Sequence, residues 1–233
     1  MDVRRLREGE SVPLQIVLAS QSPQRSGLLS RLGLNVLVQP SDVDEAFIAV
    51  PADPLEQVYL LAQAKAAAVA RHFPQHIVLG ADTLVELEGS VLGKPGSPSL
   101  ATAMLRRLSG RRHMVHTGLA LVLPEECRTA DQSRTLTAIV SSTVTFHQLD
   151  DEQIAAYVQT GEPLNKAGAY GLQGSGSQLV ASLSGCFTNV VGLPLCAIAK
   201  LLTAATGQPV LCPADAGCRA AGEEDCLCRV DSA

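Results

Sequence analysis

Tryptophan is absent from the 233 residues of this chain, and aromatic residues of all kinds make up only 3%. Proteins that bind single-stranded nucleic acid stack bases on aromatic side chains, so this composition argues against that class. Basic residues are also scarce, with 18 lysines and arginines against 23 aspartates and glutamates and a formal net charge of −5. Because a nucleic-acid backbone normally requires a basic face, we expect no nucleic-acid partner. A small polyphosphate needs only a few cations in a cleft and stays compatible with this charge.

Long apolar runs are missing as well. No segment reaches the roughly 18 apolar residues that a membrane span needs. The first residues, MDVRRLREGESVP, are charged and lack the apolar stretch of a secretory signal. The sequence therefore predicts a cytoplasmic protein with no membrane partner. Its 46% of apolar and 18% of charged residues are typical of a folded globular chain with a sizeable core.

Cysteine is not scarce, but its seven copies are unevenly distributed. Cys127, Cys186 and Cys196 are scattered through the body of the chain and are expected to be ordinary reduced thiols. The other four lie in the last 22 residues, at positions 212, 218, 226 and 228. Their spacings match no usual zinc template, and no histidine is nearby. We expect a poorly ordered tail over residues 207–233, with an adventitious metal or redox site as the alternative.

Segments typical of strands and of helices alternate along the chain. Short apolar runs predict strands over 14–20, 35–40 and 76–82, and a two-residue turn at Glu88-Gly89 predicts a hairpin within 83–95. Helical spacing with capping residues predicts helices over 22–33, 53–74, 97–110 and 150–161. Two longer strands are expected over 113–124 and 136–149, followed by a strand or hairpin, a loop and a last helix between 176 and 207. The fold class is therefore α/β, a mixed sheet with helices packed on it.

Several polar residues follow the predicted strands, and each allows a plain and a functional interpretation. The segment LASQSPQR is able to bind phosphate through backbone N–H groups at a helix start and through Ser20, Ser22 and Arg25. A capped surface helix explains the same residues equally. The acids of SDVDE (41–45) suit either a divalent cation or a solvated turn. Lys65, in an alanine-rich helix, either faces solvent or points into a cleft.

Asp82 gives a sharper signal. It ends the predicted strand HIVLGAD, and open α/β sheets place their ligands at the carboxyl ends of strands. Such an aspartate is able to ligate Mg²⁺ or to accept a proton from water, and Lys94 beyond the hairpin is able to neutralise a phosphate. Residues 160–176 carry a glycine-rich stretch that lets backbone approach a ligand closely, but it matches neither the dinucleotide fingerprint nor the P-loop.

Six segments, taken in order, resemble the Maf family of nucleoside triphosphate pyrophosphatases. They are LASQSPQRSGLL, SDVDE, GADTLV…GKP, LSGRRHMVHTG, GEPLNKAGAYGLQGSG and NVVGLPL. The resemblance covers nearly all of a domain over residues 14–206, preceded by an N-terminal extension over 1–13. It implies an elongated mixed sheet in two lobes around a deep cleft, often in a homodimer. It also implies hydrolysis of the α–β phosphoanhydride of a nucleoside triphosphate with a divalent metal cation, Mg²⁺ or Mn²⁺.

The resemblance assigns a role to individual positions. Asp82 would be the catalytic base or a metal ligand, and Glu45 would complete the metal site. The implied substrate-binding residues are Ser20, Arg25, Lys65 and Lys94.

The glycine-rich stretch looks like that of the family branch that acts on dTTP and UTP. This resemblance implies a role in removing non-canonical nucleotides, including modified pyrimidine nucleotides. The specificity positions of this branch fall on Gln24, Thr83 and Gln173, and a glutamine amide suits the imide edge of uracil or thymine. The chain departs from the family's S-P-R-R, because Gln24 stands where the first arginine is usual. The alternatives are the branch acting on 7-methyl-GTP and a catalytically idle regulatory protein of cell division.

Overall fold

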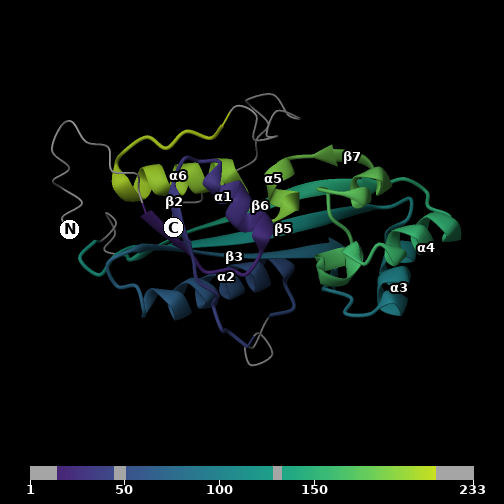
Figure 1. Cartoon of the computed structure of the whole chain (residues 1–233), viewed down its shortest axis with the longest axis horizontal. Helices are drawn as coiled ribbons and strands as arrows, with labels where there is room; N and C mark the ends of the chain where they lie inside the picture. The colour runs from purple at the N-terminus through teal and green to yellow at the C-terminus, as the bar shows by residue number, and fades with distance from the viewer. Residues whose placement is uncertain (1–14, 45–50, 128–132, 214–233) are drawn as a thin grey trace.

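The computed structural model describes residues 15–44, 51–127 and 133–213 (Figure 1). In this part of the chain seven strands form one mixed sheet in the order β2-β1-β3-β5-β6-β7, with β4 paired to β3. The strands are β1 (Gln15–Leu18), β2 (Asn35–Val38), β3 (Ile77–Leu87), β4 (Ser90–Leu92), β5 (Arg112–Val122), β6 (Thr135–Phe146) and β7 (Val180–Ser184). β1 is parallel to β2 and β3, whereas the pairs β3-β4, β3-β5, β5-β6 and β6-β7 are antiparallel.

Helices cover both faces and one end of this sheet (Figure 1). They are α1 (Pro23–Ser30), α2 (Pro54–Ala70), α3 (Pro98–Leu108), α4 (Asp151–Gln159), α5 (Phe187–Val191) and α6 (Leu195–Thr206). α2 lies on one face, α1, α5 and α6 lie on the other, and α3 and α4 lie at the end remote from β2 (Figure 1). Short 3₁₀ turns, η2 (Glu162–Asn165), η3 (Ala167–Ala169) and η4 (Ser175–Leu179), connect α4 to β7.

Four helices begin at a side chain that accepts a backbone hydrogen bond, which explains why the sequence predicts their starts well. The capping residues are Ser22, Asp53, Ser97 and Asp150. A proline follows the first three of these, where its fixed φ suits the first helical turn. Asp150 instead forms a reciprocal capping box with Gln153.

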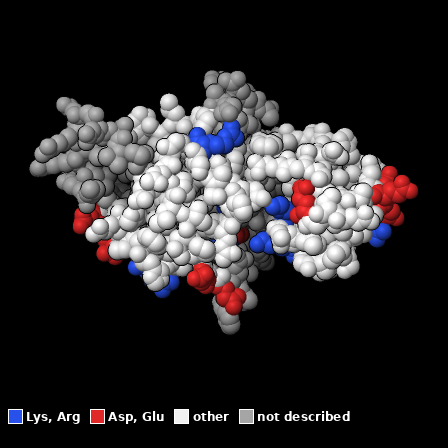
Figure 2. Space-filling view, in the orientation of Figure 1, with Lys and Arg blue, Asp and Glu red and all other residues white. Residues whose placement is uncertain are grey.

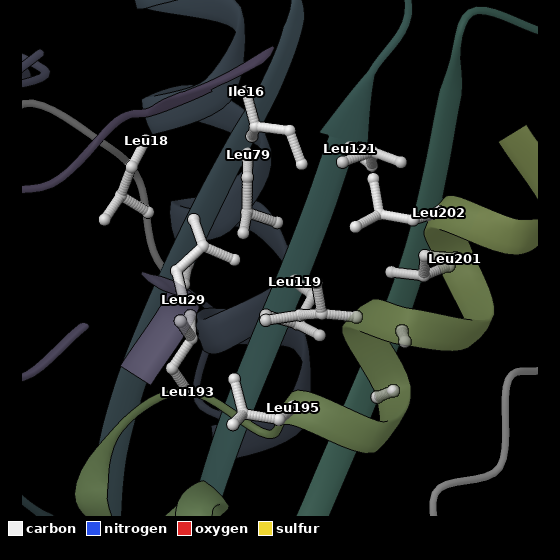
Figure 3. Packing of buried hydrophobic residues seen from close by; sticks show 14 of the residues in the cluster. Ile16, Leu18, Leu29, Leu79, Leu119, Leu121, Leu193, Leu195, Leu201 and Leu202 are labelled. Carbon is white, nitrogen blue, oxygen red and sulfur yellow. The ribbon is translucent and has the colours of Figure 1, made fainter. Parts of the chain in front are cut away.

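The buried side chains separate into clusters that define two lobes. In the lobe that contains β1, leucines of α6 and of the segment before it pack on leucines of β1, β3 and β5 (Figure 3). On the opposite face of the same lobe, α2 covers Val17, Val78 and Ala120. In the other lobe, Leu105, Phe146 and Tyr170 belong to a separate cluster that joins α3, α4 and η3 to the far ends of the strands. β3 and β5 contribute to both lobes, and the expected two-lobed mixed α/β fold is confirmed.

Most predicted elements are present, including the Glu88-Gly89 turn, where both residues have positive φ. Two predictions were wrong. The strand expected to stop at Asp82 continues to Leu87, because β5 pairs with it along nearly its whole length. The loop expected before the last helix contains the short helix α5. Among the described residues, no helix is both long and apolar enough to cross a membrane.

In the described part of the predicted tail, residues 207–213, two side chains pack against the body of the protein, those of Val210 and Cys212. Cys212 is half-buried beside the α6 residue Cys196, with the two Sγ atoms 3.0 Å apart, and both pack against the core of the first lobe. The remaining tail cysteines lie outside the described residues. Cys196 is a reduced thiol, as the sequence predicts, and it has a second reduced thiol beside it.

Candidate active site

A cleft of about 880 Å³ lies where the two lobes meet. One lobe contributes the turn between β1 and α1 and residues 190–192, and the other contributes residues 162–173 in part. Lysine and arginine side chains lie near the middle of the visible face, where the surface is hollowed (Figure 2). Of the substrate-binding and specificity residues predicted from the sequence, the seven that line the cleft are Ser20, Gln24, Arg25, Lys65, Thr83, Lys94 and Gln173.

Lys65 and Asp82 form an ion pair at this cleft. The Nζ atom of Lys65 lies 2.5 Å from Oδ1 of Asp82, and the two side chains are 11% and 12% exposed. Of the two orientations that the sequence left open for Lys65, the structure shows the one directed into the cleft. The ammonium group binds the carboxylate through Oδ1.

Two glycines bring α2 close enough to the sheet for this pair to form. A Cβ atom at Gly80 would lie 2.3 Å from the carbonyl oxygen of Ala62, and one at Gly118 would lie 2.2 Å from that of Val58. Only glycine permits such an approach between a helix backbone and a strand. The glycine of GAD thus acts on the site by letting α2 pack directly on β3, which presents Asp82.

Asp82 lies inside β3 and not at its end, but it lies beyond the point where the neighbouring strand β1 ends. β1 pairs with β3 only as far as Leu18 and Leu79. After that point the edge of β3 is no longer covered by β1, and the chain turns away through Ser20 into α1. Asp82 therefore lies at the carboxyl end of β1, which is the ligand position that the α/β rule describes. Its partner Lys65 lines the cleft, whereas Asp82 lies behind that lysine and is not itself a lining residue.

Arg25 joins three parts of the cleft wall. Its guanidinium donates to the carbonyl oxygens of Gly192 (2.9 Å) and Ala81 (2.8 Å) and to Oγ1 of Thr83 (3.0 Å). A weaker contact of 3.4 Å reaches Oγ of Ser20. The fork of donors that would suit phosphate is thus directed largely at protein oxygens. No pattern in the sequence predicts this wall-forming role.

The three predicted specificity positions have different surroundings. The Thr83 hydroxyl lies within the wall network, 2.9 Å from Oγ1 of Thr117, besides its bond from Arg25. Gln24 accepts a hydrogen bond from the Ser22 hydroxyl at 3.1 Å, which holds its amide at the start of α1. Gln173 is exposed on the opposite lobe. Lys94 follows β4 and is also exposed.

Three cleft residues were missed from the sequence, namely Glu162, Asn165 and Lys166. They belong to η2 or follow it, inside the stretch that attracted notice only for its glycines. The available signal was the placement of a carboxylate and a lysine within that same stretch. Lys166 adds a cation to the cleft wall, and its side chain lies over Gly171, where a Cβ would meet its Cε atom at 3.5 Å.

A Ser-His-Glu trio outside the cleft has a structural explanation. His116 on β5 contacts Glu86 of β3 through Nε2 (2.9 Å) and Ser141 of β6 through Nδ1 (2.7 Å). None of the three lines the cleft. The trio satisfies a buried histidine across three strands, as buried polar groups require.

The donors available for a metal are carboxylate oxygens, which suit Mg²⁺ or Mn²⁺. Asp82 provides one such group, and Asp42 lines the same cleft. No cluster of three or more metal-ligating side chains occurs within residues 15–44, 51–127 and 133–213. Glu45 lies outside the described residues, so its place in a metal site stays a prediction.

The cleft is lined by a lysine that is paired with a buried carboxylate and by further cations, and it lies where the sheet changes from parallel to antiparallel strands. This arrangement is typical of an α/β protein that binds a small anionic ligand. Comparison with known proteins makes the assignment specific. The profile of the family described as Maf-like protein matches residues 15–205. The chain belongs to the Maf family.

Relatives named dTTP/UTP pyrophosphatase match most of this chain. The dTTP/UTP pyrophosphatase of Moorella thermoacetica is 52% identical over 190 residues, which are 81% of this chain and 93% of the relative. The dTTP/UTP pyrophosphatase of Symbiobacterium thermophilum is 50% identical over 190 residues, with the same coverage. The solved dITP/XTP pyrophosphatase of Mycobacterium abscessus is 19% identical at a TM-score of 0.38, covering 58% of this chain and 76% of that one, which is too distant to bear on the site.

Proposed function

We propose that this protein is a nucleoside triphosphate pyrophosphatase that hydrolyses dTTP and UTP to the monophosphate and pyrophosphate. The observation that carries the proposal is the Lys65–Asp82 pair in a cation-lined cleft. Family membership and the names of the two relatives support the substrate class. A house-cleaning role toward modified pyrimidine nucleotides belongs to the same proposal.

In this mechanism Asp82 is the general base. Its Oδ2 accepts a proton from a water molecule, whose oxygen bonds to the α-phosphorus while the bond to the α–β bridging oxygen breaks. Pyrophosphate leaves with the electron pair of that bond. Lys65 keeps the carboxylate oriented through Oδ1, and Lys94 offsets the charge on the departing group. Positioned bases of this kind contribute about 10²–10⁴-fold to the rate.

A divalent cation fits the oxygen donors of this site. In the other role that the family resemblance gives it, Asp82 would hold the ion together with Glu45, and the bound ion would lower the pKa of a coordinated water and offset phosphate charge. Ser20 and Arg25 would contact the phosphates from the turn before α1. Since Arg25 also holds the cleft wall, its role has a structural component as well.

Base recognition is assigned to Gln24, Thr83 and Gln173. The amide of Gln173 offers one donor and one acceptor, which match the imide edge of uracil or thymine. Because Gln24 stands where the family motif usually has an arginine, the site has one cation fewer. The substrate range is therefore to be measured with a panel of nucleotides that includes 5-methyl pyrimidine nucleotides and 7-methyl-GTP. A preference for 7-methyl-GTP would move the chain to the other branch.

Release of pyrophosphate from UTP or dTTP in the presence of Mg²⁺ tests the proposal. Asp82→Asn should lower kcat by about 10²–10⁴-fold while the fold is kept. Asp151→Asn is the matched control, because Asp151 is 77% exposed in an ion pair with Arg106 far from the cleft lining. Wild-type turnover by Asp82→Asn would refute the assignment of the base. A wild-type protein without pyrophosphate release would favour the idle regulatory alternative.

The proposal also includes a cytoplasmic homodimer that acts without nucleic acid. The net charge of −5 supports the absence of a nucleic-acid partner. Light scattering coupled to gel filtration tests the dimer directly.

A further inference from the structure

The segment Gly171–Gly176 of the cleft rim is held by two side chains that precede it. The Tyr157 hydroxyl on α4 accepts from the backbone N–H of Gly171 (3.2 Å) and donates to Oε1 of Glu162 (3.0 Å). The other oxygen of that carboxylate accepts from the N–H of Ser175 (3.1 Å). The segment is therefore fixed at two points, one on either side of Gln173.

The glycines of this segment fit around the same two side chains. A Cβ at Gly174 would lie 2.7 Å from Oε2 of Glu162, and one at Gly176 would lie 2.6 Å from the Tyr157 hydroxyl. Gly174 also has φ of 156°, which side chains rarely adopt. The sequence suggested that these glycines let backbone approach a ligand. For Gly174 and Gly176 the structure shows instead an approach to Glu162 and Tyr157.

Tyr157, which contacts both Gly171 and Glu162, is anchored in the protein core. Tyr157 is 4% exposed and belongs to the core of the second lobe. Burial raises the pKa of the Tyr157 phenol well above its usual value, and the hydrogen bond and the charge of Glu162 raise it further. The phenol consequently keeps its proton and its bond to Glu162 across the working pH range.

Gln173 is itself exposed and lines the cleft, so its side chain has little else to fix it. We propose that Tyr157 and Glu162 are positioning residues that hold Gln173 at the base end of the cleft, so that discrimination between uracil and cytosine depends on them. This inference rests on the proposed function. UTP and CTP are the informative pair, because the edge that a glutamine amide would read has donor and acceptor exchanged between them.

Tyr157→Phe is the first test, because it deletes the hydroxyl that bonds to both Gly171 and Glu162. We expect the ratio of kcat/KM for UTP over CTP to fall by roughly 10-fold, as befits the loss of two hydrogen bonds around one residue. The change should appear mainly in the KM for UTP, since the Asp82–Lys65 pair belongs to β3 and α2 and lies outside this segment. Tyr59→Phe is the matched control, because the Tyr59 hydroxyl has no hydrogen-bond partner among the described residues.

A double-mutant cycle separates positioning from a general structural effect. In the background Gln173→Ala the ratio should already be low, and adding Tyr157→Phe should not lower it further. An equal further loss in that background would overturn the inference. If Tyr157→Phe does not fold, Glu162→Gln serves the same purpose, because an amide nitrogen would replace one of the two acceptor oxygens.

The outcomes separate this inference from the function on which it rests. A wild-type protein that does not hydrolyse UTP would contradict the proposed function. An active wild type, combined with an unchanged UTP-to-CTP ratio in Tyr157→Phe and Glu162→Gln, would contradict the positioning role alone.

Discussion

Gly80→Ala tests whether the approach of α2 to the sheet sets the geometry of the active site. The added methyl group would lie 2.3 Å from the carbonyl oxygen of Ala62 and 2.7 Å from the backbone nitrogen of Ala66. Ordinary non-bonded contacts lie at about 3.5 Å, so α2 has to retreat by roughly 1 Å. Neither neighbour is able to swing aside, because both are helix backbone. Lys65 would move with the helix away from Asp82.

Two measurable losses follow from that displacement. Overpacking of this kind typically costs about 1–3 kcal/mol of unfolding free energy. A misplacement of about 1 Å near reacting groups is able to reduce turnover by about 10²-fold. We therefore expect a lower melting temperature together with a fall in kcat that persists at temperatures where the variant is fully folded.

The assay is pyrophosphate release from UTP at saturating substrate, paired with thermal unfolding of the same preparation. Gly27→Ala is the matched control: Gly27 lies in α1, and a Cβ there would have no atom within 4 Å. In a helix interior that change should stabilise by up to about 1 kcal/mol. Wild-type turnover and melting in Gly80→Ala would refute the reasoning.

Three further predictions concern other parts of the chain. Burial lowers the pKa of His113 to about 4. As pH falls, the His113 imidazole therefore binds a proton in the unfolded chain before it does so in the folded protein. About 3 kcal/mol of stability, complete above pH 6.5, should be lost between about pH 6.5 and 4. His113→Gln should flatten this part of a urea-unfolding profile, and an unchanged slope would count against it. Arg25→Lys should lower the unfolding free energy by about 2–4 kcal/mol, because lysine is unable to replace the fork of donors; an effect on KM alone would indicate a purely phosphate-binding role. Treatment with a disulfide reagent should oxidise Cys196 and Cys212 to a disulfide, with their two electrons and protons passing to the reagent, and raise stability by about 3 kcal/mol; peptide mapping that finds both thiols intact would contradict this.

The sequence predicts the elements well where local chemistry decides them. Ser22 and Ser97 cap their helices as expected, and Glu88-Gly89 forms the expected turn. The end of β3 was misjudged because Asp82 looks like a strand terminator. β5 pairs with β3 past Asp82, and its residues lie more than thirty positions further along the chain. No local sequence pattern reveals such a pairing.

The candidate site divides in the same way. The family motifs point to the cleft-lining residues Arg25, Lys65 and Lys94, because such motifs record residue types in order along the chain. The motifs do not record what each side chain contacts. That Arg25 binds carbonyl oxygens of the cleft wall, and that Glu162 holds the glycine-rich segment, depends on contacts between distant segments.

The long strands that pass through both lobes have a consequence for how the cleft meets its ligand. β5 and β6 are paired in unbroken register from Arg112 opposite Thr145 to Val122 opposite Thr135. A continuous ladder resists rotation of one lobe against the other, so we expect the two ends of the cleft to keep a nearly constant separation. We then expect the cleft to select ligands by the distance from the nucleobase to the α-phosphate, without a preceding closure of the lobes. Stopped-flow binding should accordingly show a single exponential whose rate rises linearly with nucleotide concentration, without the plateau that a closing step would impose.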